Sequence, residues 1–179
     1  MKYIPSIIFV LCSQLLICQS LSDLDMKNGF RDFKLGSTQS QIKNISIDEN
    51  QYSKNPNVKS YIYNGQDIKS VFNVEVGRIT LGFFQDKLFS IMVSFDDFNT
   101  NNQFELIEFN ALKSSLEKLY GYNWKPASTE LVDLNGVIWS GNKVNLELNR
   151  IYYSENSFYS GFMHIYDKAL MKKMYESEY

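Results

Sequence analysis

The sequence has few of the side chains that common metal and catalytic sites require. It holds one histidine, His164, and two cysteines, Cys12 and Cys18. A zinc site needs several His, Cys or carboxylate ligands, and a Ser-His-Asp triad in this chain would depend on His164. The nucleophile elbow Gly-x-Ser-x-Gly, a glycine-rich phosphate loop and the His-Glu-x-x-His motif are all absent. We therefore expect neither a metal site nor a cofactor.

Proline and glycine are also scarce, with 3 and 9 residues. No Pro/Gly/Ser-rich linker and no long run of like charges divides the chain, so a single domain is expected. The formal net charge of −2 at pH 7 comes with no basic patch. Nucleic acid is therefore not an expected partner.

Residues 1–20 have the pattern of a signal peptide. Lys2 provides a positive charge at the start, an uncharged apolar stretch follows, and the next charged side chain is Asp23. The small-residue pattern of residues 18–20 favours cleavage near Ser20. The apolar stretch is shorter than the ~20 residues of a membrane-spanning helix. The mature protein is then expected to be a single domain of residues 21–179 without cysteine.

Export predicts a periplasmic or extracellular location. The alternative is lipoprotein processing at Cys18, which would leave a lipid-anchored envelope protein. Ile17 stands where such processing usually has a small residue, which favours the cleaved form without an anchor. Contact with a membrane is expected only if Cys18 is lipidated.

Aromatic residues are abundant, with 13 Phe and 12 Tyr. Between residues 58 and 95, apolar and polar side chains alternate, as in Phe72, Val74 and Val76, and short turn sequences separate the runs. Alternation with period two is typical of antiparallel strands that are buried on one face and open to water on the other. The same pattern returns between residues 137 and 166.

A long helix is predicted from about residue 101 to Tyr120. Thr100 and Gln103 have the spacing of a capping box, and Gly121 stands where a helix terminator belongs. The predicted buried face contains Phe109, Leu112, Leu116 and Leu119, and the exposed side contains Glu108, Lys113 and Lys118.

Shorter helical patterns occur near each end of the mature chain. Thr38 and Gln41 have capping-box spacing and predict a helix over residues 37–45. Near the C-terminus, the pattern of residues 167–175 fits either a last amphipathic helix or a frayed terminus.

Together these elements predict an α+β fold in which helices pack an antiparallel sheet. A capped helix followed by strands occurs twice, which suggests two tandem α-β-β-β repeats with halves at residues 29–98 and 99–179. This arrangement resembles the tandem-repeat architecture of exported beta-lactamase-inhibitor proteins and of related small outer-membrane assembly lipoproteins. Residues 29–36, Gly-Phe-Arg-Asp-Phe-Lys-Leu-Gly, are similar to the opening of many uncharacterised exported bacterial proteins. The resemblance implies a protein-binding role in the cell envelope.

One strand offers a candidate binding surface. Alternation places Met163 and Ile165 on one face of the predicted strand 158–166. The aromatic side chains on the opposite face are Phe158, Phe162, His164 and Tyr166. Protein interfaces favour aromatic residues, so we predict that this group binds a partner. Among these neighbours His164 is expected to be a packed or half-exposed side chain rather than a catalytic one.

We expect a non-enzymatic protein-binding module whose partner is another envelope protein. The alternative is a small secreted hydrolase, such as a glycosidase that uses two carboxylates. Asp96 and Asp97 follow a predicted strand, but adjacent residues on an extended chain point in opposite directions and do not form a ready pair. A cleft that holds two acids ~5–10 Å apart would favour the glycosidase.

Overall fold

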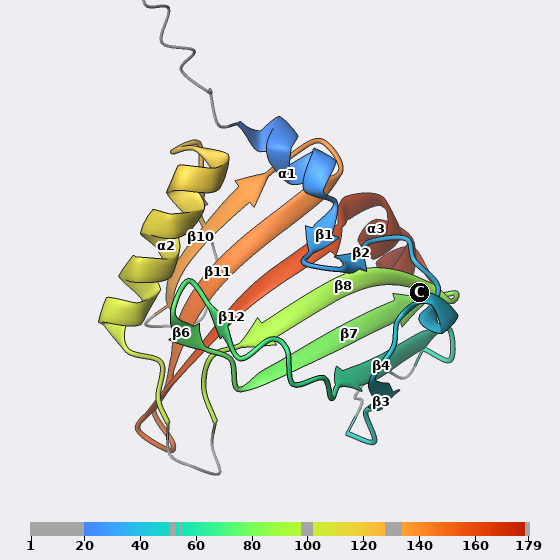
Figure 1. The fold of residues 1–179 in the computed structure, drawn as a ribbon, viewed down its shortest axis with the longest axis horizontal. Helices are drawn as coiled ribbons and strands as arrows, with labels where there is room; N and C mark the ends of the chain where they lie inside the picture. The colour runs from blue at the N-terminus through green and yellow to red at the C-terminus, as the bar shows by residue number, and fades with distance from the viewer. Residues whose placement is uncertain (1–19, 51–52, 54, 98–101, 128–133, 178–179) are drawn as a thin grey trace, which may run out of the picture.

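The chain folds into one large antiparallel sheet with helices packed against it, an α+β architecture (Figure 1). The computed structural model describes residues 20–50, 53, 55–97, 102–127 and 134–177. Nearly all of the predicted signal peptide and both cysteines lie outside these residues. Within them, no helix is both long enough and apolar enough to cross a membrane.

The large sheet has eight strands in the order β3-β4-β7-β8-β12-β11-β10-β9. Their bounds are β3 (Ile45–Ile47), β4 (Val58–Tyr63), β7 (Arg78–Phe84), β8 (Lys87–Ser94), β9 (Lys125–Pro126), β10 (Leu134–Ser140), β11 (Val144–Tyr153) and β12 (Phe158–Asp167). In each half of the chain the strands run in sequence order from an edge of the sheet to its centre, where β8 pairs with β12. Each half thus contributes four strands to the large sheet, and the tandem repeat of halves 29–98 and 99–179 stays a prediction.

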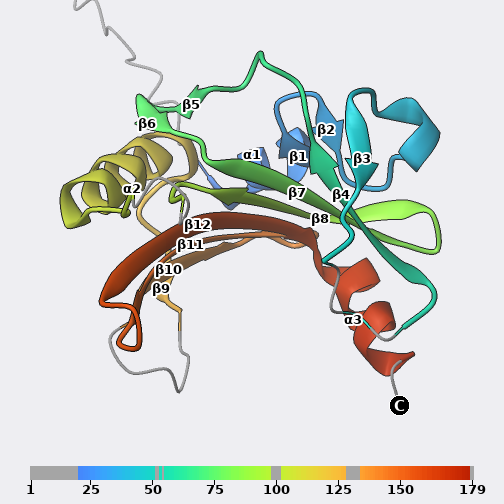
Figure 2. The ribbon, with the colours of Figure 1, turned by 90° about the horizontal axis from the view of Figure 1, so that it is seen from below.

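Two helices and two small hairpins cover one face of the sheet (Figure 2). They are α1 (Leu21–Lys27), α2 (Leu106–Tyr120), the hairpin of β1 (Gly29–Phe30) and β2 (Phe33–Lys34), and the hairpin of β5 (Ser70–Val71) and β6 (Val74–Glu75). Buried side chains that alternate along the central strands form the core beneath them: Ile79, Leu81, Ile91, Val93, Leu146, Leu148, Met163 and Ile165. Trp139 joins this core to the end of α2, because its Nε1 donates a hydrogen bond to the carbonyl of Gly121 at 2.9 Å.

Helix α1 was not predicted, and Asp25 fastens it to the turn between β10 and β11. The Asp25 carboxylate accepts three backbone hydrogen bonds, from the N–H groups of Asn142 at 2.7 Å and of Lys143 and Val144 at 2.9 Å each. The preceding residue, Leu24, is fully buried. The residues that directly follow the predicted leader are therefore part of the folded domain.

Helix α2 ends at Tyr120 with Gly121 as its C-cap, as predicted, but it begins at Leu106 rather than near residue 101. Glu105 is its N-cap, and the predicted cap Thr100 lies outside the described residues. The buried side chains are Phe109, Leu112, Leu116 and Tyr120, whereas Leu119 is 39% exposed, so its predicted burial was wrong. Successive helix residues turn by about 100°, which brings Tyr120 closer than Leu119 to the centre of the buried face.

The predicted helix over residues 37–45 is wrong, because the structure has only the 3-10 turn η1 (Gln39–Gln41) there. The capping box itself is present, with the Thr38 N–H donating to Gln41 Oε1 at 2.8 Å. Asn44 then adopts a left-handed φ of 57°, which ends any helix and turns the chain into β3. The helical alternative for the C-terminus is confirmed as α3 (Lys168–Glu176), capped by the Asp167 side chain.

Candidate functional site

The face of the sheet opposite α1 and α2, called the open face below, is covered only at one end among the described elements. There α3 packs Met174 against Val58, Phe84 and Phe89. Figure 2 shows that β10, β11 and β12 bow away from this side, so that the open face is concave. A concave, largely uncovered sheet face is the feature of this fold most suited to binding.

Hydrogen-bonded side chains from several strands meet at the centre of the open face. His164 Nε2 on β12 lies 2.8 Å from Ser90 Oγ on β8. On the other side of β12, the Tyr166 hydroxyl donates to Glu147 Oε1 of β11 at 2.7 Å and accepts from Asn145 Nδ2 at 2.9 Å. The His164 and Tyr166 rings pack together with centroids 4.8 Å apart. The result is a polar network with an aromatic centre that extends over three neighbouring strands.

The protonation of this network follows from its burial. Burial lowers the pKa of His164 below 6.5, against the opposing influence of the Glu147 charge, so the imidazole is neutral at pH 7. Burial also raises the pKa of Tyr166 to about 12; the hydrogen bond from Asn145 opposes this rise and Glu147 adds to it. The tyrosine hydroxyl is therefore a permanent donor to Glu147 at physiological pH.

One member of the face is not fully satisfied. Asn149 on β11 is 4% exposed, and within the described part of the chain its Oδ1 has no hydrogen-bond partner. Its amide nitrogen reaches Glu147 Oε2 only at 3.5 Å. A buried acceptor without a partner costs about 1–3 kcal/mol. The strand opposite it presents Phe162 at the same register, so the unpaired oxygen lies close to the predicted aromatic row.

A depression of about 480 Å³ opens beside this network, over β4, β7 and β8. Its lining includes Thr80, Met92 and Ser94, and an ion pair closes one side, with Arg78 Nη2 at 2.6 Å from Asp48 Oδ2. The hollow arises from a difference in side-chain size between neighbouring strands. The register sets the small Ser94 of β8 beside the much larger Phe162 of β12. Its volume lies within the range of about 300–1,000 Å³ typical of ligand sites.

The predicted site residues share one side of β12, as alternation required, but differ in exposure. Phe162, His164 and Tyr166 are half-buried on the open face. Phe158 is only 3% exposed and therefore has little surface to offer a partner. Sequence reasoning missed Ser90, Asn145, Glu147 and the Arg78–Asp48 pair, because nothing in the local pattern indicates which strands become neighbours.

The trio of Ser90, His164 and Glu147 contains the residue types of a hydrolytic triad but not its geometry. Glu147 accepts its short hydrogen bond from Tyr166 rather than from the imidazole, so it does not orient His164 as a base. The backbone N–H groups of these central strands are engaged in the sheet ladder, which leaves no donor pair for an oxyanion. Across the described residues, no group of three His, Cys, Asp or Glu side chains could hold a metal ion.

No protein family, curated protein or solved structure matches this chain.

Proposed function

We propose that this protein is an exported, non-enzymatic binding module of the cell envelope or the extracellular space, and that its open face binds another envelope protein. The observation that carries the proposal is the concave face with its depression of about 480 Å³ beside a row of half-buried aromatics. Interfaces are enriched in Tyr, Phe and Arg, and this face combines Tyr166, Phe162 and Arg78.

The shape of the face defines the kind of partner surface. A concave sheet with a hollow accepts a convex element, so the partner contributes a protruding loop or hairpin. Arg78 and Asp48 at the edge of the depression offer a donor and an acceptor, while the hydroxyls of Thr80 and Ser94 make no side-chain hydrogen bond to any described residue. A polar side chain of the partner would enter the hollow, and its apolar neighbours would pack on Phe162 and Tyr166.

The separations of the other acids from Glu147 argue against a glycosidase pair that includes this residue. Glu147 lies on β11 and Asp48 directly follows β3, five strand positions away, which is roughly 24 Å at about 4.8 Å per strand. Asp96 accepts a hydrogen bond from Ser160 on β12. Ser160 is four residues from His164, the residue opposite Glu147, which corresponds to roughly 13 Å along the strand. Both separations exceed the ~5–9.5 Å of glycosidase carboxylates.

The test is affinity capture from envelope extract with matched variants. Phe162→Ala combined with Tyr166→Ala removes the aromatic row, and Ser94→Met fills the depression without placing a second cation opposite Arg78. The control combines Phe72→Ala with Tyr122→Ala, which removes aromatics that are 40% and 76% exposed and lie off the open face. Thermal melts verify that each variant is folded.

We expect a specific partner to be captured by the wild type and by the control and to be lost from both open-face variants. Equal capture by all four proteins would remove the open face as the binding surface. Turnover of a glycan that Glu147→Gln abolishes would overturn the binding function itself.

A further inference from the structure

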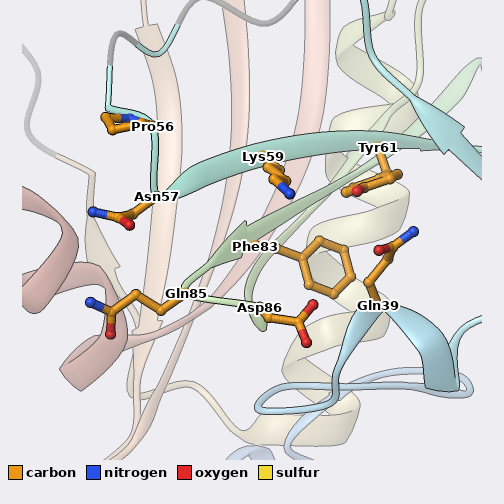
Figure 3. Close-up of a pocket in the computed structure, with 8 residues that line it drawn as sticks. All are labelled: Gln39, Pro56, Asn57, Lys59, Tyr61, Phe83, Gln85 and Asp86. Carbon is orange, nitrogen blue, oxygen red and sulfur yellow. The ribbon is translucent and has the colours of Figure 1, made fainter.

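A second pocket, of about 190 Å³, lies on the other side of the sheet, away from the open face (Figure 3). Residues from η1, from the start of β4 and from the β7–β8 turn line it. Lys59 of β4 stands opposite Phe83 of β7 in the sheet register, and both point to the side on which α2 packs. The pocket is therefore structurally independent of the proposed protein-binding surface.

The floor of this pocket is aromatic and rigid. The rings of Tyr61 and Phe83 pack edge to face with centroids 5.4 Å apart. Phe83 is 2% and Tyr61 8% exposed, so both are held by the core and present only a narrow apolar surface. Figure 3 shows the Phe83 ring between Lys59 on one side and Asp86 on the other.

The turn that forms one rim is held in an unfavourable conformation. Gln85 and Asp86 have φ values of 49° and 60°, in the left-handed region, and they form the two-residue connection between β7 and β8. Such turns favour Asn-Gly, because most side chains are strained there. Strain of this kind concentrates at functional sites. In this protein it places two polar side chains at the rim of the pocket.

The pocket lining contains one residue of each charge, Lys59 and Asp86, and they do not pair with each other. Lys59 and Asp86 both line the pocket, yet neither makes an ion pair or a side-chain hydrogen bond with any other described residue. The amide side chains of Gln39 and Gln85 are likewise exposed and without a partner there. The pocket thus offers a cation, an anion and two amides around an apolar floor.

We propose that this pocket binds a small zwitterion of amino-acid size. The ligand carboxylate would pair with Lys59 Nζ and its ammonium group with Asp86, while Gln39 and Gln85 complete the hydrogen bonds and Tyr61 supports the hydrocarbon part. A ligand with a single charge would leave Lys59 or Asp86 without a partner. A volume of about 190 Å³ corresponds to roughly six waters at about 30 Å³ each, which suits one amino acid and excludes a folded peptide.

The experiment uses three probes that differ only in charge: L-valine, N-acetyl-L-valine and L-valinamide. Binding to the purified, ¹⁵N-labelled protein is followed by the amide shifts of the lining residues. We expect L-valine to shift these amides and to bind about 10-fold more tightly than either blocked probe.

Two variants assign each charge to its partner. Lys59→Gln should reduce valine affinity about 10-fold and make valine and valinamide equivalent. Asp86→Asn, which suits the left-handed turn, should make valine and N-acetylvaline equivalent. Lys118→Gln on the exposed side of α2 is the matched control and should bind valine as the wild type does. Absence of shifts at about 10 mM valine, equal binding of the three probes, or unchanged binding in both variants would overturn the proposal.

Discussion

Ser90 Oγ and His164 Nε2 are joined by a hydrogen bond of 2.8 Å across the β8–β12 pair, although 74 residues separate them in the chain. This bond lies where the two halves of the sheet meet. It links the one histidine of the protein to β8, one of the strands that line the depression. The titration of His164 is therefore a measure of the structure of the open face.

Titration of His164 should reveal its burial. Burial lowers the pKa of His164 in the folded protein below its unfolded value of about 6.5. At a pH between the folded and the unfolded pKa, the unfolded chain therefore binds more protons than the folded one. Stability should be complete above pH 6.5 and fall as the pH drops through 6.5, by at most about 1.4 kcal/mol per pH unit. Denaturant unfolding between pH 7 and pH 5 measures this.

His164→Gln is the control for that titration, since an amide can keep a hydrogen bond to Ser90 without titrating. The variant should lose the pH dependence attributed to the histidine. Identical curves for variant and wild type would place the histidine in contact with solvent instead.

Asp25→Asn should destabilise the domain by about 1–3 kcal/mol, because the amide nitrogen cannot accept from the β10–β11 turn. Burial tends to raise the pKa of Asp25, but the three backbone donors and the Lys143 charge together lower it below 3.8. The contribution of Asp25 to the free energy of unfolding should therefore be complete above pH 3.8. It should be lost as the pH falls through the lower pKa that Asp25 has in the folded protein. Chemical denaturation at pH 7 and pH 3 checks both statements, with Asp32→Asn on the exposed β1–β2 turn as the control.

Leu116→Ala should cost about 2–5 kcal/mol, because this side chain is 2% exposed in the core beneath α2. Lys118→Ala on the exposed side should change stability by less than about 0.5 kcal/mol. Lys113 is not a neutral control, since its Nζ lies 3.8 Å from the centre of the Trp124 ring and 3.6 Å from Glu117. Equal melting temperatures for Leu116→Ala and wild type would show that the helix register is wrong.

Replacing Gln85-Asp86 by Asn-Gly should stabilise the protein by about 1–2 kcal/mol, since both residues occupy the left-handed region. For a domain of this size that corresponds to a rise of roughly 2–8 °C in Tm. The same variant lacks the Asp86 carboxylate, so it should be more stable and bind L-valine less well than the wild type. A lower Tm would mean that the turn is not strained.

Local pattern was sufficient for most of the large-sheet strands and for most of α2. It was wrong at residues 72–76, because Phe72 and Asn73 have left-handed φ values of 49° and 68° and form the turn between β5 and β6, which leaves Phe72 40% exposed. Period two placed Phe162, His164 and Tyr166 on one side of β12 because adjacent side chains in a strand point to opposite faces whatever the strand pairs with. The local pattern of residues 37–45 gave a wrong prediction. The capping box is present, but only one 3-10 turn follows it before Asn44 reverses the chain. A cap starts a helix, but the following residues decide whether it continues.

The sequence by itself determined the α+β class and the faces of the individual strands, since both depend on contacts between residues close in the chain. Only the tertiary structure decided that β12 lies between β8 and β11, which brings Ser90, His164 and Glu147 together and sets Ser94 next to Phe162. Strand partners are chosen by which pairing buries the apolar faces of both halves beneath α1 and α2, a property of the whole chain. The depth of the open face and the burial of Phe158 follow from that choice, so no local pattern could have predicted them.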